Sequence, residues 1–86
     1  AKEGQVFAGV ISGVTPFGLF VQLPNGVEGL VHVSNMTDDY YQYLEKQLAL
    51  QGERTKKRYR IGDEVRVRLT RANLAERTID FELVED

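Results

Sequence analysis

The amino-acid sequence predicts an all-β fold: a small barrel of five antiparallel strands, with an insertion between the third and the fourth. Five segments alternate apolar and polar residues with a period of two, and turn-forming residues separate them. The chain has 86 residues, 42% of them hydrophobic, which suits a single domain with one modest core. It has no cysteine, which excludes disulfides and thiolate metal sites, and no apolar run approaches the roughly 20 residues of a membrane span.

The first strand is expected over residues 5–14. Val6, Ala8 and Val10 alternate on one of its faces. Two glycines within this segment permit the bending that a closed sheet requires.

The second and third strands are expected to form a hairpin. Leu19, Val21 and Leu23 recur with a period of two and should face the core. The Asn25-Gly26 pair is typical of the tight turns that close hairpins. The strand that follows, which ends near Val33, has apolar residues on both faces and should therefore lie centrally or bend.

Three ring-bearing side chains of this hairpin form the candidate site. If its alternate neighbours face the core, Phe20 must face water, where a large ring is costly unless something stacks on it. Phe17 belongs by strict alternation to the core set, so placing it beside Phe20 requires a bulge or a turn. We hypothesise that Phe17, Phe20 and His32 form one exposed aromatic surface. The alternatives are a core position for Phe17, an ordinary surface ring at Phe20, and a packed or solvated imidazole at His32.

Residues 34–61 allow two interpretations. Asp38-Asp39 could cap a helix from Tyr40 to about Gln51, which intrinsic propensity favours. The competing interpretation is a β-ribbon, because alternating pairs occur in three short arms separated by a turn at residues 52–55. In those arms the alternating residues are Tyr41 and Tyr43, then Leu48 and Leu50, and on the return Tyr59 and Ile61.

The last two strands have clean alternation. In the first of them Val65, Val67 and Leu69 are expected to point inward, with Arg66 and Arg68 outward. Residues 72–77 form a turn. The final strand should direct its alternate apolar residues inward, namely Ile79, Phe81 and Leu83.

The charge of the chain is strongly polarised. The formal net charge is −2, yet residues 54–77 contain nine of the 11 basic residues and only three of the 13 acidic ones. A basic flank beside exposed aromatic rings is typical of nucleic-acid binding. The candidate phosphate contacts are Lys56, Arg58, Arg66, Arg68, Arg71 and Arg77, although the Lys56-Lys57-Arg58 run is also compatible with a solvated loop.

The segments that carry this pattern resemble the RNA-binding domain first named in ribosomal protein S1, which has a five-stranded OB-fold. The resemblance extends over roughly residues 4–83 and is carried by Gly4-Gln5-Val6, Gly9-Val10-Ile11, Phe17-Gly18-Leu19-Phe20-Val21, Glu28-Gly29-Leu30-Val31-His32-Val33-Ser34, Gly62-Asp63-Glu64-Val65 and Ile79-Asp80-Phe81-Glu82-Leu83. The middle of the chain is similar to the C-terminal S1-type domain of ribonuclease R, a processive 3′-to-5′ exoribonuclease. This second resemblance rests on residues 36–41, 50–55 and 59–63, and it favours the ribbon over the helix.

The resemblance implies where RNA would bind. The two exposed phenylalanines of the family match Phe17 and Phe20, and its histidine matches His32. The polar residue of its last turn, commonly Asp, matches Asn73, and the basic residue four positions later matches Arg77. Asn73 thus departs from the common acid, which removes a negative charge and puts in doubt any role that needs a carboxylate.

The function expected from the sequence is binding of single-stranded RNA with little sequence preference. Residues 1–86 would form one non-catalytic S1-type domain, a fragment of a larger exoribonuclease. No set of residues with the spacing of a nuclease centre, a phosphate-binding loop or a catalytic triad is present, so magnesium is expected in the catalytic domain of the parent protein and no cofactor in this one. We expect a cytoplasmic location, a monomer, the rest of the parent enzyme as a partner, and no membrane. The alternative is an S1-type or protein-docking module of a translation-associated protein.

Overall fold

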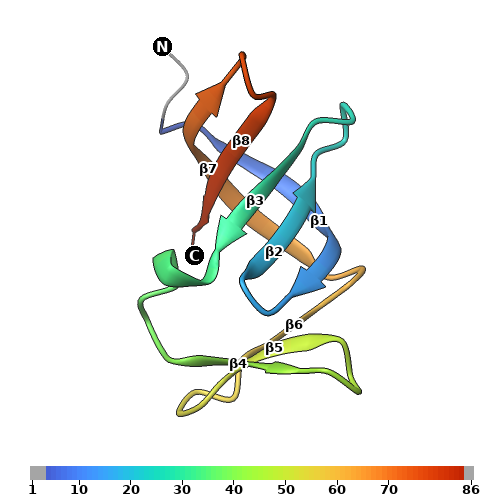
Figure 1. Cartoon of the computed structure of the whole chain (residues 1–86), viewed down its shortest axis with the longest axis vertical. Coiled ribbons are helices and arrows are strands. Elements are labelled where there is room, and N and C mark those ends of the chain that lie inside the picture. The colour runs from blue at the N-terminus through green and yellow to red at the C-terminus, as the bar shows by residue number, and fades with distance from the viewer. Residues whose placement is uncertain (1–3, 85–86) are drawn as a thin grey trace.

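The computed structural model describes residues 4–84, which form a closed five-stranded barrel with a small three-stranded sheet at one end (Figure 1). Around the barrel the strands follow the order β1-β2-β3-β8-β7. Their bounds are Val6–Thr15 for β1, Gly18–Gln22 for β2, Glu28–His32 for β3, Glu64–Asn73 for β7 and Thr78–Leu83 for β8. The predicted OB-type barrel is therefore confirmed. The described part of the chain contains no helix with the length and apolarity of a membrane span.

The strands of the barrel pair antiparallel except at one seam. There β3 and β8 run parallel, with Leu30 opposite Asp80 and Val31 opposite Phe81. An antiparallel arrangement throughout was expected, and at this seam the expectation is wrong. The reason is geometric, because strand directions cannot alternate all the way around a closed ring with an odd number of strands. The parallel seam brings together strands that are almost 50 residues apart in the chain.

Alternate side chains of the barrel strands fill its interior. Leu19, Val21 and Val67 have no exposed surface and Phe81 is 1% exposed, as the period of two predicted. Val31 is also fully buried, although the sequence left the inner face of its strand open. The first strand differs in one respect, because the face that carries Val6, Ala8 and Val10 lies on the outside. The inner face of β1 contributes Ile11, a fully buried residue that the sequence analysis did not single out.

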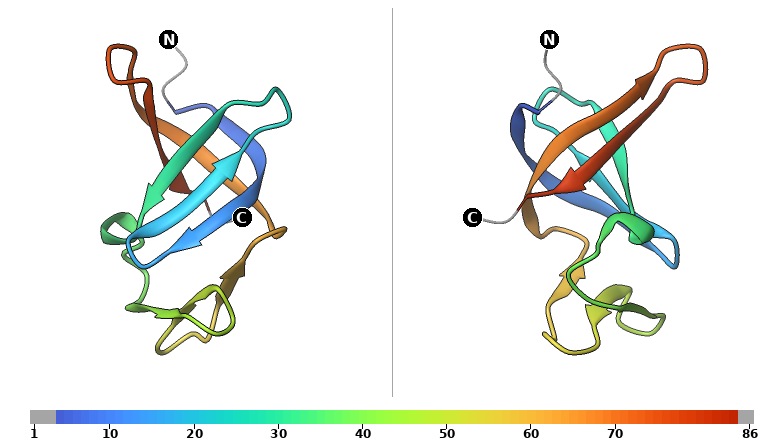
Figure 2. Two further views of the ribbon diagram at one scale, coloured as in Figure 1. Left: turned by 45° about the vertical axis from the view of Figure 1, so that its right-hand side comes forward. Right: turned by 90° about the vertical axis from the view of Figure 1, so that its left-hand side faces the viewer.

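The insertion is a sheet, so the ribbon interpretation is confirmed and the helix is wrong. Its strands are β4 (Tyr41–Leu44), β5 (Ala49–Gly52) and β6 (Arg58–Arg60), joined in this order and preceded by the single 3-10 turn η1 (Val33–Asn35). Figure 2 shows this sheet below the barrel from two further directions. Side-chain burial overrides helix propensity here, because Leu50 is completely buried and the half-buried tyrosines Tyr41, Tyr43 and Tyr59 pack against the same core. The other predicted members of the arms are exposed: Leu48 lies in a turn with a positive φ, and Ile61 follows β6.

A buried carboxylate joins the segment before β4 to the β5–β6 turn. Asp39, whose side chain is fully buried, accepts hydrogen bonds from the backbone N–H groups of Tyr40 (2.7 Å), Arg54 (3.0 Å) and Thr55 (2.8 Å) and from the Thr55 hydroxyl (2.9 Å). The hydrogen bonds from Thr55 and its neighbours outweigh desolvation and hold the pKa of the Asp39 carboxyl well below its usual range. A side chain at Gly52 would collide with this carboxylate, since a Cβ there would lie 2.6 Å from Asp39 Oδ2. Asp39 thus caps a loop, not the helix for which it was considered.

Replacing a fully buried barrel residue should destabilise the fold. We expect Val67→Ala to lower the free energy of unfolding by about 1–3 kcal/mol, because it removes two methyl groups and leaves a cavity in a close-packed core. Chemical denaturation measures the change. Val10→Ala is the matched control, because Val10 is 43% exposed and its loss should change stability far less. Equal losses in the two variants would contradict the assignment of inner and outer faces.

The Asp39 carboxylate should make stability depend on acid pH. Because its pKa is depressed in the folded state, it contributes stability above the unfolded-state value of about 3.9, and this contribution is lost as the pH falls through that value toward the folded pKa. We expect Asp39→Asn to lower the denaturation midpoint at neutral pH, and the gap from the unaltered chain to narrow as the pH falls below about 4. Urea unfolding followed across this range tests both statements. A gap that stays constant with pH would show that the charge of Asp39 does not stabilise the loop.

Candidate nucleic-acid interface

The turn between β1 and β2 places Phe17 at the surface. Thr15 pairs with Gly18, and the Thr15 hydroxyl oxygen accepts hydrogen bonds from the backbone N–H groups of Phe17 (3.2 Å) and Gly18 (3.0 Å). Phe17 therefore lies in the turn and not in β2. For this reason the alternation of β2 does not direct its side chain into the core. Its side chain is 54% exposed.

Phe20 follows on the outer face of β2, where it is half-buried. The ring centroids of Phe17 and Phe20 lie 6.4 Å apart, with their planes at 87°. Edge-to-face geometry of this kind is favourable for aromatic pairs. The two rings consequently make a corner and not one flat aromatic surface.

His32 lies on the outer face of β3, opposite Gly18 of β2. The close approach of these strands requires a glycine, because a Cβ at position 18 would run into the carbonyl oxygen of Val31. The imidazole is not packed in the interior: its side chain is 41% exposed, and its Nε2 lies 3.2 Å from Asp80 Oδ1 across the parallel seam. A carboxylate therefore orients the ring on the surface.

A groove of about 450 Å³ runs along the outer wall formed by β2, β3, β8 and the β7–β8 turn. It brings together five of the ten residues proposed from the sequence, namely Phe20, His32, Arg71, Asn73 and Arg77. Phe17 does not line the groove but touches it through its contact with the Phe20 ring. The same wall contains residues that the sequence analysis did not assign to the site, namely Glu28, Leu30, Glu76 and Asp80. The outward parity of Asp80 was predicted, but only closure of the barrel shows that β8 borders β3.

The turn that ends the groove is held by Asn73. Its Oδ1 accepts a hydrogen bond from the backbone N–H of Glu76 at 3.1 Å, and its Nδ2 lies 3.5 Å from Glu76 Oε1. Arg77 closes this turn with a positive φ of 57°. A carboxylate at position 73 could accept the same backbone hydrogen bond, so the asparagine keeps the turn while omitting one negative charge.

The charges along the groove are mixed. The side chains of Arg71 and Arg77 make no hydrogen bond or ion pair with other residues within 4–84, so both guanidinium groups are available to a ligand. The carboxylates have partners: Glu28 accepts a hydrogen bond of 2.6 Å from the Ser12 hydroxyl, and Asp80 faces His32. The free positive charge is thus concentrated near the β7–β8 turn.

Arg68 and Arg66 lie farther along β7, outside the groove. Arg68 Nη1 forms an ion pair of 2.9 Å with Glu82, the residue opposite it on β8. Farther along the same outer wall, Arg71 lies opposite Asp80 in the strand register. Arg66 is exposed and stands beside Ala8 of β1. Both side chains point outward as predicted, but they do not converge on the aromatic rings.

Lys56 and Arg58 belong to the insertion, at the opposite end of the molecule from the β7–β8 turn (Figure 1). Lys56 lies in the β5–β6 turn with a φ of 63°. The Arg58 guanidinium donates two hydrogen bonds to Gln51 Oε1, at 2.8 and 2.6 Å. These two basic residues are consequently separate from the groove.

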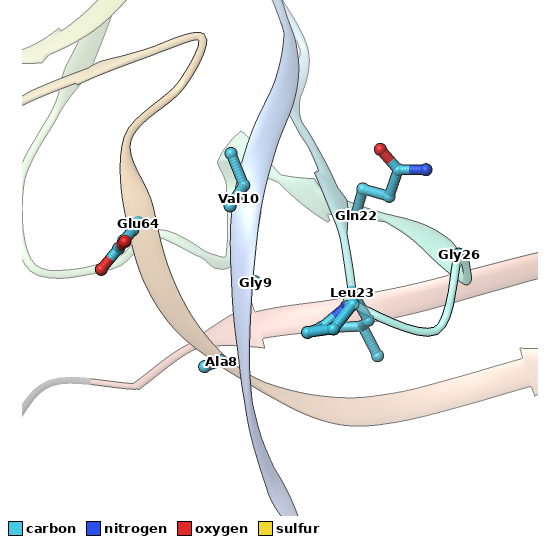
Figure 3. Close-up of a pocket in the computed structure, with 8 residues that line it drawn as sticks. Ala8, Gly9, Val10, Gln22, Leu23, Gly26 and Glu64 are labelled. Carbon is cyan, nitrogen blue, oxygen red and sulfur yellow. The ribbon is translucent and has the colours of Figure 1, made fainter.

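A second hollow, of about 610 Å³, lies across β1, β2 and the start of β7. Figure 3 shows Val10 on β1 between Gln22 and Glu64, with Glu64 as the one charged side chain of its lining. None of the residues proposed for RNA contact lines this hollow. Its polar groups do not converge, so it does not have the features of a specific site.

Two acidic side chains outside the groove, those of Asp38 and Asp63, have structural hydrogen bonds. Asp38 accepts the Tyr41 hydroxyl at 3.0 Å, and Asp63 accepts the backbone N–H of Arg60 at 2.9 Å. Within residues 4–84, no three histidine or acidic side chains are grouped so that they could hold a metal ion.

The sequence matches the family model described as "S1 RNA binding domain" over residues 1–83. The chain belongs to this family. It is 49% identical over 84 residues to ribonuclease R of Escherichia coli and 44% identical over 81 residues to ribonuclease R of Ureaplasma parvum. These alignments cover 96% and 94% of this chain but only 10% and 11% of the relatives, so the S1 domain spans about a tenth of the length of the curated proteins it matches.

The S1 domain also superposes on solved structures of a related enzyme. Ribonuclease R of Mycoplasma genitalium matches with a TM-score of 0.86 and 28% identity, covering 93% of this chain and 13% of that one. A second structure of the same enzyme, with the same scores, is in complex with ribose-methylated single-stranded RNA. The resemblance to ribonuclease R that the sequence carried is thereby confirmed.

Proposed function

We propose that this S1 domain binds single-stranded RNA with little sequence preference, as an accessory domain of a 3′-to-5′ exoribonuclease of the ribonuclease R type. One observation carries the proposal: the groove on the outer wall joins the half-buried ring of Phe20 and the partly exposed imidazole of His32 to two arginines whose side chains have no partner within residues 4–84. The single-stranded RNA bound to the Mycoplasma enzyme supports the choice of ligand.

The rings account for affinity without sequence preference. Every base has a π-face, and stacking on an aromatic side chain contributes about 1–3 kcal/mol per base whatever its identity. The Phe17 and Phe20 rings are nearly perpendicular, so a base stacked on Phe20 meets Phe17 at the corner between the two rings. The RNA backbone must therefore bend at this point. His32, oriented by Asp80, provides a third ring on the same wall.

The cations provide the contacts to phosphate. Arg71 and Arg77 are the primary candidates, since both line the groove and neither has a partner within residues 4–84. Asn73 supports the turn that positions Arg77. Arg66, Arg68, Lys56 and Arg58 are candidates for additional contacts along a longer RNA. Two or three stacking contacts with these few arginines would give roughly micromolar binding, about −8 kcal/mol, after the costs of ordering.

The role within the parent protein follows from size and chemistry. Because the S1 domain spans about a tenth of ribonuclease R, we assign hydrolysis and its magnesium ions to another domain of a cytoplasmic parent enzyme. This domain would grip the RNA without catalysing its cleavage. It would do so as a monomer, with the rest of the parent enzyme as its protein partner.

Removing the central ring should weaken RNA binding without unfolding the barrel. We expect Phe20→Ala to reduce the affinity for oligo(U) or oligo(A) by about 1–3 kcal/mol, because one stacking surface is lost from the outer wall. Fluorescence anisotropy measures the affinity and circular dichroism the fold. Gln22→Ala is the matched control, since Gln22 shares the outer face of β2 but does not line the groove. Unchanged affinity in a folded Phe20→Ala variant would refute the stacking role.

The salt dependence of binding should identify the cations that contact phosphate. For single strands, the slope of log affinity against log salt is about −0.7 per neutralised phosphate, so Arg71→Gln should make it shallower by about that amount. Lys56→Gln removes the same charge from the insertion and should change the slope less, because Lys56 is separate from the groove. Salt titration of both variants makes the comparison. If the affinity of the unaltered chain for RNA does not depend on salt at all, phosphate contacts do not account for the binding. The alternative function, docking of a protein partner, would then be favoured.

A further inference from the structure

The insertion presents one aromatic side chain that the core does not use. Three of the four tyrosines of the chain are half-buried and pack against the hydrophobic core. Tyr40 instead is 79% exposed, the most exposed aromatic ring within residues 4–84. Exposure of one large ring alone has no functional meaning, so the surroundings of Tyr40 decide the matter.

The backbone that bears Tyr40 is held firmly on both sides. Its N–H donates to Asp39 Oδ1 at 2.7 Å, and its carbonyl oxygen accepts a hydrogen bond of 2.8 Å from the N–H of Glu53. The ring therefore projects from a part of the backbone that is fixed in the fold.

An arginine lines the same hollow as Tyr40. The Arg54 guanidinium lies 3.3 Å from the carbonyl oxygen of Asp38 and 3.7 Å from Asp39 Oδ1, while 76% of its side chain stays exposed. Tyr40 and Arg54 line the same hollow of about 380 Å³. An exposed ring and an exposed guanidinium at one hollow match the two chemical features of a nucleotide, its base and its phosphate.

The carboxylates of Asp38 and Asp39 have partners that reduce their repulsion of a bound phosphate. Both oxygens of Asp39 accept hydrogen bonds within the loop, and the carboxylate is fully buried. Asp38 accepts the Tyr41 hydroxyl at 3.0 Å and lies 3.4 Å from Lys57 Nζ. The negative charges of Asp38 and Asp39 are thus compensated by hydrogen-bond donors and by the cations of Lys57 and Arg54.

The hollow at Tyr40 adjoins the groove on the barrel. His32 lines the groove and Val33 lines the hollow, and one peptide bond joins them. The N–H of Val33 donates to the carbonyl oxygen of Phe17 at 2.8 Å, which fixes η1 against the turn that bears the outermost ring. In Figure 1 the β1–β2 turn and η1 both lie at the end of the barrel that faces the insertion.

We propose that Tyr40 and Arg54 form a second nucleotide subsite, which extends the single-stranded RNA path from the groove across Phe17 and η1 onto the insertion. A base stacks on the Tyr40 ring, and Arg54 contacts an adjacent phosphate. The subsite rests on the proposed RNA-binding function and gives the insertion a role in it. It also predicts that affinity increases with RNA length beyond what the groove alone accommodates.

The test compares RNAs of two lengths on the 86-residue chain. An oligo(U) of about 4 nucleotides fills the groove, and one of about 12 nucleotides reaches the insertion, within the range that single OB-folds cover. We expect Tyr40→Ala to weaken binding of the long RNA at least about fivefold and to leave the short RNA unaffected. Tyr40→Phe should bind like the unaltered chain, because it keeps the ring.

Two controls separate the possible outcomes. Leu48→Ala removes an exposed apolar side chain from the same insertion, away from the hollow, and should change neither affinity. If Tyr40→Ala binds the long RNA normally while Phe20→Ala does not, the second subsite is refuted and the proposed function stands. If Tyr40→Ala weakens both lengths equally, a separate subsite is also refuted. If the unaltered chain binds neither RNA, the proposed function fails and the subsite fails with it.

Discussion

Burial of alternate side chains inside a closed ring of five strands is the constraint on which the candidate site depends. Leu19, Val31 and Phe81 have almost no exposed surface and interlock in the barrel interior. Because successive strand residues point to opposite faces, their burial fixes Phe20, Leu30 and Asp80 on the outer wall. A register slip of one residue would turn that wall inward and expose the core. Burial of the core side chains, which stabilises the barrel, therefore also positions the side chains that face the ligand.

Closure of the ring determines the chemistry of the outer wall. The parallel seam sets β8 beside β3, so a carboxylate from one end of the chain orients an imidazole from the middle. The groove that results has mixed charge, with available guanidinium groups near the β7–β8 turn and partnered carboxylates along its length. A surface of this kind suits a ligand that offers π-faces and phosphates in alternation. It is less suited to a purely electrostatic partner, since its positive charge is local.

The insertion is stabilised differently from the barrel. It shares one buried leucine and three half-buried tyrosines with the core, and a buried carboxylate joins the entrance of β4 to the β5–β6 turn. Satisfied hydrogen bonds to backbone N–H groups substitute there for apolar contacts, which a three-stranded sheet of this size cannot supply in number. One consequence is that the exposed side chains of Tyr40 and Arg54 project from backbone that hydrogen bonds to this carboxylate hold in place.

The sequence by itself determined the barrel, its inward residues on three of the five strands, and the outward position of Phe20, because a period of two is a local property of the chain. The S1-type motifs added Asn73 and matched His32 and Arg77, which the hairpin and the charge distribution had already indicated. Tertiary structure decided what no local pattern encodes: which arginines share a wall with the rings, that β1 turns the face of Val10 outward, and that Asp80 meets His32. It also decided the conformation of the insertion, since burial of Leu50 against the barrel outweighs a helix propensity that is summed over neighbours alone. Contacts between strands distant in sequence form only when the ring closes, and the composition of the site follows from that closure.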